Sequence, residues 1–63
     1  MTTYTNSEVR SLIDERLHSE RDRAILKRRL VDGIRHETLA NEFGMSVVQI
    51  RRICSNGKKV IGI

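Results

Sequence analysis

Basic side chains gather toward the C-terminal end of the sequence in a pattern that suits contact with a polyanion. Between positions 46 and 63 the chain holds four basic residues and no acidic one, namely Arg51, Arg52, Lys58 and Lys59. An arginine donates two parallel hydrogen bonds to a guanine edge or a phosphate, whereas a lysine presents a point charge to a phosphate. The chemistry that this segment predicts is non-covalent recognition of a nucleic acid.

The charge of the whole chain is distributed unevenly. The 63 residues carry a net charge of +4 at neutral pH. Residues 1–22 hold five acidic and three basic side chains, a net −2, whereas residues 23–63 hold nine basic and three acidic ones, a net +6. A positive field concentrated at one end attracts a polyanion. The alternative interpretation, a charged surface that is simply solvated, stays open at this point.

Other function classes find little support in the residues. No apolar run exceeds three residues, and a membrane-spanning helix needs about 20. Cys54 is the only cysteine, so no internal disulfide is expected and a reducing cytoplasm fits best. Cys54, His18 and His36 lack the spacing of metal ligands, and no nucleophile has a recognisable base and orienting partner. We therefore expect a cytoplasmic protein that is not an enzyme, with no cofactor, metal, small-molecule substrate or membrane partner.

Periodic apolar residues predict an all-α domain, a small bundle of about four helices. The chain has no proline, so glycines and capping residues mark the helix ends. The expected helices cover residues 6–17, 20–32, 36–43 and 46–55, with Asn56 and Gly57 ending the last one. We expect a single domain over residues 1–63, made of a bracing or self-association helix (1–18), a tri-helical core (20–57) and a tail (58–63). The tail is left open between packed and frayed.

Capping residues locate the starts of three of these helices. Thr5 is followed three residues later by Glu8, and Ser46 is followed by Gln49 at the same spacing. In such a capping box each of the two side chains accepts a hydrogen bond from the backbone N–H of the other residue. Ser19 is the expected cap of the second helix.

The last two expected helices have the spacing of a DNA-binding motif. Counting His36 as the first position of a twenty-residue unit, Ala40 falls fifth, Gly44 ninth, Ile50 fifteenth and Ile53 eighteenth. The small Ala40 lets the two helices approach closely, and Gly44 permits a sharp turn at positive φ. In these residues the sequence resembles the helix-turn-helix families, and more narrowly the fourth region of bacterial sigma-70-like factors. The segments that carry the resemblance are Arg23-Ala-Ile-Leu, Leu30-Val-Asp-Gly33, Leu39-Ala40, Phe43-Gly44-Met45-Ser46 and Gln49-Ile50-Arg51.

The resemblance covers roughly residues 20–59 and implies a protein that reads DNA with the helix after Gly44. Two positions differ from the family's pattern. Arg35 stands where a serine or threonine cap is usual, and Gly57 stands where the pattern continues the recognition helix into a longer basic tail.

A rotation of about 100° per residue divides the helix after Ser46 into two sides. We expect Ile50, Ile53 and Cys54 to face the core. The predicted base-facing residues are Val47, Val48, Arg51, Arg52 and Ser55, since arginine suits guanine and valine suits thymine methyl groups. The predicted phosphate contacts are Arg35, His36, Lys58 and Lys59. The basic run Lys27, Arg28 and Arg29 is interpreted as a solvated helix face.

The sequence therefore predicts a sequence-specific double-stranded DNA-binding protein, a small transcription regulator that inserts a recognition helix into the major groove. The resemblance implies a bacterial, phage or mobile-element origin. One such module covers only about 600–1,000 Å² of surface, so a homodimer or a larger transcription complex is expected for tight binding. The alternative is a protein–protein adaptor of the same fold that contacts transcription machinery or another protein. In that case Val47 and Val48 would cover a partner helix.

Overall fold

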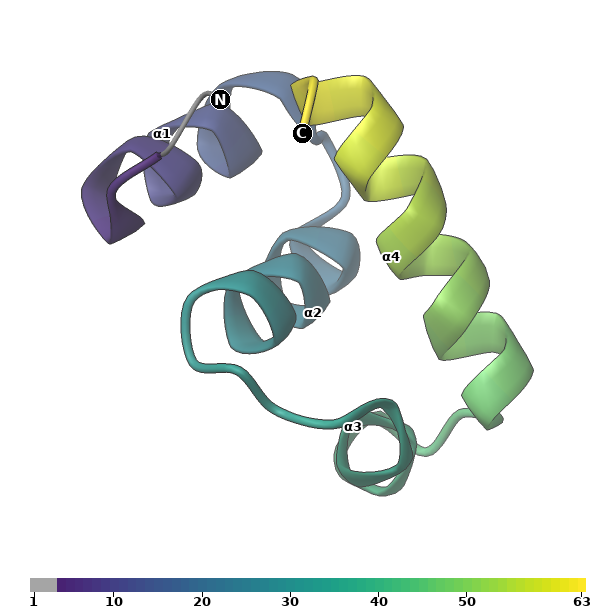
Figure 1. Cartoon of the computed structure of the whole chain (residues 1–63). Coiled ribbons are helices and arrows are strands. Elements are labelled where there is room, and N and C mark those ends of the chain that lie inside the picture. Colours follow the sequence, from purple (N-terminus) through teal and green to yellow (C-terminus); the bar gives the residue numbers. More distant parts are fainter. Residues whose placement is uncertain (1–3) are drawn as a thin grey trace.

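The chain folds into four helices, and there is no strand within residues 4–63, the part that this computed structural model describes. The helices are α1 (Asn6–Arg16), α2 (Glu20–Leu30), α3 (His36–Phe43) and α4 (Val47–Ile61). α2 lies in the middle and contacts the other three, while α4 runs along one side and reaches α1 with its C-terminal end (Figure 1). The expectation of an all-α protein of about four helices is confirmed. None of the helices described combines the length and the apolar content that crossing a membrane requires.

Short polar side chains begin three of the four helices where the sequence predicts. Both capping boxes form: the Thr5 hydroxyl accepts from the Glu8 backbone N–H at 3.2 Å, and the Ser46 hydroxyl accepts from that of Gln49 at 3.1 Å. Ser19 caps α2 in the same way. α3 begins at His36, and its N-cap residue Arg35 makes no side-chain capping hydrogen bond, as expected from the residue type there.

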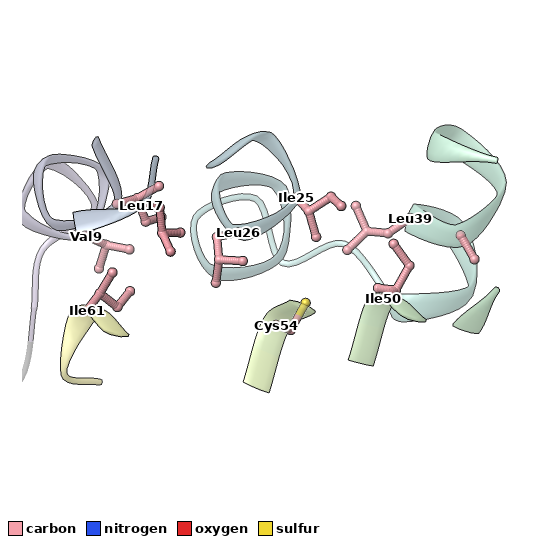
Figure 2. Close-up of a cluster of buried hydrophobic side chains, with 10 residues drawn as sticks. Val9, Leu17, Ile25, Leu26, Leu39, Ile50, Cys54 and Ile61 are labelled. Atoms are coloured by element: carbon pink, nitrogen blue, oxygen red, sulfur yellow. The ribbon is translucent and has the colours of Figure 1, made fainter. Parts of the chain in front are cut away.

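Ten buried side chains form one core that joins all four helices: Val9, Ile13, Leu17, Ile25, Leu26, Leu39, Ala40, Ile50, Cys54 and Ile61. Val9 lies over Ile61 at one end of this core, and Leu39 lies beside Ile50 at the other end (Figure 2). Cys54 is 4% exposed, which confirms the prediction of a core thiol. Burying a leucine or isoleucine side chain contributes about 1.5–3 kcal/mol, so these contacts are what holds the helices together.

The prediction that Asn56 and Gly57 end the last helix is wrong. α4 continues to Ile61 and ends at Gly62, which takes the left-handed conformation with φ 81°. Gly57 is instead a buried residue inside the helix. The buried positions Ile50, Cys54, Gly57 and Ile61 follow one another at spacings of four, three and four, which is a single stripe on a helix. The tail is therefore packed, since Ile61 is only 1% exposed.

Two other helix ends differ slightly from the prediction. α1 ends at Arg16 and α2 at Leu30, where the sequence predicts ends at positions 17 and 32. Leu17 and Val31 are the cap residues that follow these helices. Boundaries of this kind shift easily by one or two residues because helix ends fray.

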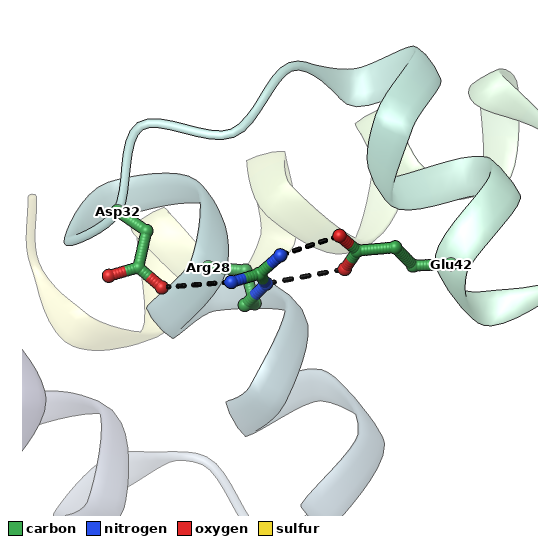
Figure 3. A network of polar contacts seen from close by, with 3 residues as sticks. All are labelled: Arg28, Asp32 and Glu42. Atoms are coloured by element: carbon green, nitrogen blue, oxygen red, sulfur yellow. Dashed lines mark hydrogen bonds and ion pairs between the residues drawn. The ribbon is translucent and has the colours of Figure 1, made fainter.

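The basic run on α2 connects helices, which differs from the solvated face expected for it. The Arg28 guanidinium donates to both carboxylate oxygens of Glu42 on α3, at 2.5 and 3.2 Å, and to Asp32 at 3.3 Å (Figure 3). Lys27 Nζ lies 2.7 Å from an Asp14 carboxylate oxygen on α1, and this contact lowers the pKa of Asp14. Two adjacent cations of α2 thus form partly exposed ion pairs with carboxylates of α1 and α3.

Candidate nucleic-acid interface

The predicted base-facing residues lie on one side of α4, the side away from the core. Val48, Arg51, Arg52 and Ser55 are exposed. Val47 is different, because it is half-buried and packs against the core cluster. The exposed part of the predicted base-facing set is thus made by the other four residues. Ile53, expected to face the core, is half-buried and packs against the core cluster.

All four cations of α4 belong to this exposed side, which we call the basic face of α4 and define by Arg51, Arg52, Lys58 and Lys59. At about 100° per residue they fall within an arc of about 120° around the helix axis. Val48 and Ser55 lie inside the same arc. The buried stripe from Ile50 to Ile61 occupies the other side of the helix. A helix of this kind presents positive charge in one direction only.

The cations of the basic face have no carboxylate partner among residues 4–63. The four ion pairs formed there involve Arg21, Lys27 and Arg28 with carboxylates of the first three helices and the loop after α2, and none includes a residue of α4. α4 itself carries no acidic residue. Lys27 and Arg28 of α2 therefore pair with carboxylates of other helices, whereas the four cations of α4 form no ion pair within residues 4–63.

A tight turn sets the direction of α4 relative to α3. Gly44 takes the left-handed conformation with φ 63° and ψ 37°, which most other residues resist. The Met45 N–H donates to the Ala40 carbonyl at 2.9 Å and closes the end of α3. Ala40 is 6% exposed and small, so it allows the two helices to pack closely. This turn leaves Val48 and Gln49, the second and third residues of α4, exposed beside the start of the basic face.

The predicted phosphate contacts lie at two places around this surface. Arg35 is exposed just before α3, and His36 is half-buried at its first position. Lys58 and Lys59 are exposed in the last turns of α4.

Charged side chains of α2 and α4 affect the pKa of His36. Burial lowers the pKa of His36 most, and the positive charges of Arg29, Arg51 and Lys58 lower it further, against the opposing negative charge of Glu37. The imidazole therefore lies in a positive field made by side chains of α2 and α4.

Arg29, which the sequence analysis interpreted as part of a solvated helix face, is partly buried and lies near His36. Its Nη1 donates to the Ile34 carbonyl at 3.0 Å, which places the guanidinium beside the loop that leads to His36. Its charge acts on both His36 and Cys54. A signal was present in the sequence, because position 29 follows the buried Ile25 and Leu26 by four and three residues and so lies on the packed side of α2.

Comparison of the chain with protein-family models, with curated proteins and with solved structures finds no match. Function must therefore be inferred from the surface itself. Within residues 4–63 no three His, Cys, Asp or Glu side chains come together as metal ligands would. Burial raises the pKa of the Cys54 thiol, which keeps it in the protonated, unreactive form. Among the features described above, the basic face of α4 is where positive charge without an ion-pair partner in residues 4–63 is concentrated.

Proposed function

We propose that this protein binds double-stranded DNA by inserting the basic face of α4 into the major groove, and that it acts as a small transcription regulator. In this proposal α2, α3 and α4 are the tri-helical helix-turn-helix core. The observation that carries the proposal is the presence, on one side of a helix that has no acidic residue, of four cations that form no ion pair within residues 4–63. Unneutralised arginine and lysine on one face are what phosphate binding uses.

The dimensions of α4 support this assignment. Its 15 residues span about 22 Å at 1.5 Å per residue, and the major groove is wide enough to admit one helix. Arg51 and Arg52 lie in the first half of α4 and would reach base edges, while Lys58 and Lys59 lie two turns further on and would meet phosphates. The continuation of α4 through Gly57 also agrees with the longer recognition helix that the sigma-70-like resemblance implies.

A salt series tests the proposal most directly. The full chain is titrated into fluorescently labelled duplex DNA at several salt concentrations. We expect affinity to fall with salt with a slope of about −0.9 for each phosphate contacted. Weak binding that does not change with salt would contradict the proposal.

Substitution of the two arginines tests where DNA binds. R51A/R52A is expected to lose the preference for a selected site over mixed DNA, because a bidentate arginine–guanine pair discriminates by about 1–3 kcal/mol. The matched control is R10A/R16A, which removes the same charge from exposed positions of α1 and should keep the preference. Equal losses in both variants would overturn the assignment of the face.

The two lysines are expected to behave differently from the arginines. K58A/K59A should weaken binding to all sequences alike, and the salt slope should fall by about 1 for each phosphate that the variant no longer neutralises. A change in sequence preference in this variant would place the lysines on base edges instead.

A second candidate function has one observation in its favour. Val60 and Ile63 are 49% and 48% exposed at the end of α4, away from Val48 and its neighbours. Exposed aliphatic residues of this kind suit contact with a protein, so the chain would serve as an adaptor in a larger complex. Analytical ultracentrifugation of V60D/I63D beside the wild type tests for a self-associated form. A transcription complex is tested by whether this variant keeps DNA binding but loses transcriptional effect.

A further inference from the structure

Val48 is an aliphatic side chain that lies outside the core of the fold. It is 59% exposed, more than any other large hydrophobic residue described. Its neighbour Val47 is half-buried and packs against the core, whereas Val48 is not among the side chains that do so. The Ser46–Gln49 capping box fixes the first turn of α4 and so fixes the direction of Val48.

The surroundings of Val48 are cationic. Arg51 and Arg52 follow it by three and four residues, which are the positions adjacent to it on a helix surface. Both are exposed and lack an ion-pair partner among residues 4–63. Val48 is thus a small apolar patch next to two guanidinium groups, at the end of α4 where the turn from α3 leaves it accessible.

This combination matches one feature of a DNA major groove. Arginine pairs with the O6 and N7 atoms of guanine, and the apolar group that a base offers in this groove is the C5-methyl of thymine. We infer that α4 reads a 5-methylpyrimidine adjacent to a guanine, with Val48 contacting the methyl group and an arginine contacting the guanine. The inference rests on the proposed function and adds the identity of the base that Val48 selects.

A regulatory consequence follows from the chemistry of the methyl group. The C5 positions of thymine and 5-methylcytosine carry the same methyl at the same place in the groove. A site with cytosine at this position would therefore bind more tightly after methylation of that cytosine. Val48 makes the protein sensitive to a DNA modification as well as to sequence.

The test removes the methyl group from the DNA and the side chain from the protein in turn. A site is selected from random duplexes with the full chain, and each thymine is replaced singly by uracil, which deletes only the methyl. One position is expected to weaken binding by about fourfold, the factor that corresponds to the burial of one methyl-sized group. In V48A the uracil and thymine duplexes should bind equally well. Because Val48 is exposed and outside the core, this variant is expected to fold, which circular dichroism checks.

V60A is the matched control, since Val60 is another exposed valine of α4 and lies about 120° away around the helix. It should keep the full penalty for uracil. Placing cytosine and then 5-methylcytosine at the same position should recover about fourfold on methylation in the wild type and in V60A, but not in V48A.

The outcomes separate the two proposals. A selected site whose affinity depends on salt but is unchanged by uracil at every position overturns the role of Val48 and leaves DNA binding standing. A uracil penalty that persists in V48A also overturns it. If no duplex is enriched and binding does not respond to salt, the proposed function fails and the inference fails with it.

Discussion

Gly57 of α4 lies directly against Leu26 of α2: a Cβ atom at position 57 would be 2.7 Å from Leu26 Cδ2 and 2.8 Å from Leu26 Cγ. Leu26 is fully buried, so it has little room to move away. The absence of a side chain at position 57 therefore sets how closely α4 approaches α2. α4 also carries the basic face. The contact at Gly57 therefore helps to position Arg51, which precedes it along the helix, and Lys58, which follows it.

Replacing Gly57 with alanine is expected to destabilise the protein. At an exposed helix position the change would stabilise by about 1 kcal/mol through helix propensity. Here the added methyl overpacks the core, which costs about 1–3 kcal/mol, so we expect a net loss of about 1 kcal/mol in the free energy of unfolding. Urea denaturation followed by circular dichroism measures it. N56A, one residue away and exposed, should instead gain about 0.5 kcal/mol. Stabilisation by G57A would show that the contact is looser than described.

The position of Gly57 shows where sequence reasoning succeeded and where it did not. The starts of α1 and α4 were predictable because a capping box is a local interaction between residues three apart. The turn at Gly44 was predictable because positive φ favours glycine wherever it occurs. A glycine used for close packing has the same identity as a glycine that ends a helix. Only Leu26, far earlier in the chain, distinguishes the two, and local patterns do not report such a contact.

The candidate site, too, was predictable from the sequence only where local patterns decide the outcome. Exposure of Val48, Arg51, Arg52 and Ser55 followed from helical periodicity, because the opposite stripe had to be buried. The ion pair of Arg28 did not follow from periodicity, since its partner Glu42 lies on another helix. A basic run in a sequence does not say which of its charges are paired within the fold. Which charges are paired depends on how the helices pack against each other.

The Arg28–Glu42 ion pair is expected to contribute to the attachment of α3 at low salt only. E42Q keeps the shape of the side chain but removes its charge, so we expect a lower melting temperature at low ionic strength. The difference from wild type should shrink as salt screens exposed charges beyond roughly 0.5 M. E15Q removes an exposed carboxylate near the C-terminal end of α1 that forms no ion pair within residues 4–63 and is the control. Equal effects of E42Q and E15Q at low salt would show that general charge balance, rather than this pair, is responsible.

Cys54 is expected to be protected from thiol reagents in the folded protein. It is 4% exposed, and burial raises the pKa of its thiol, so little thiolate forms at pH 8. Reaction with Ellman's reagent should be slow in buffer and fast in denaturing urea. The variant C54A/S55C moves the thiol to the exposed neighbouring position and should react quickly without urea. Fast labelling of the native wild type would mean that the core opens readily around α4.

We expect His36 to make the stability of the fold and the proposed DNA affinity depend on pH with opposite signs. Burial, followed by the charges of Arg29, Arg51 and Lys58, lowers its pKa in the folded chain below the ordinary value of about 6.5. The unfolded chain therefore takes up this proton at a higher pH than the folded chain does. Stability from this group is present above pH 6.5 and is lost as the pH falls through 6.5 toward the lower pKa of the folded state. Bound phosphate acts in the other direction, because its negative charge offsets the three cations and favours the protonated imidazole.

Replacing His36 with glutamine should therefore remove both effects together. In the wild type we expect the free energy of unfolding to decrease as the pH falls from 7.5 to about 5.5. DNA affinity should increase over the same range. Binding takes up a proton there because a nearby phosphate raises the pKa of His36. H36Q should show a weaker dependence in both measurements, made by urea denaturation and by DNA titration across the same pH range. H18Q replaces the exposed histidine after α1 and should retain both. If DNA affinity stays independent of pH in the wild type while stability still falls, His36 is buried by the fold but does not face a phosphate.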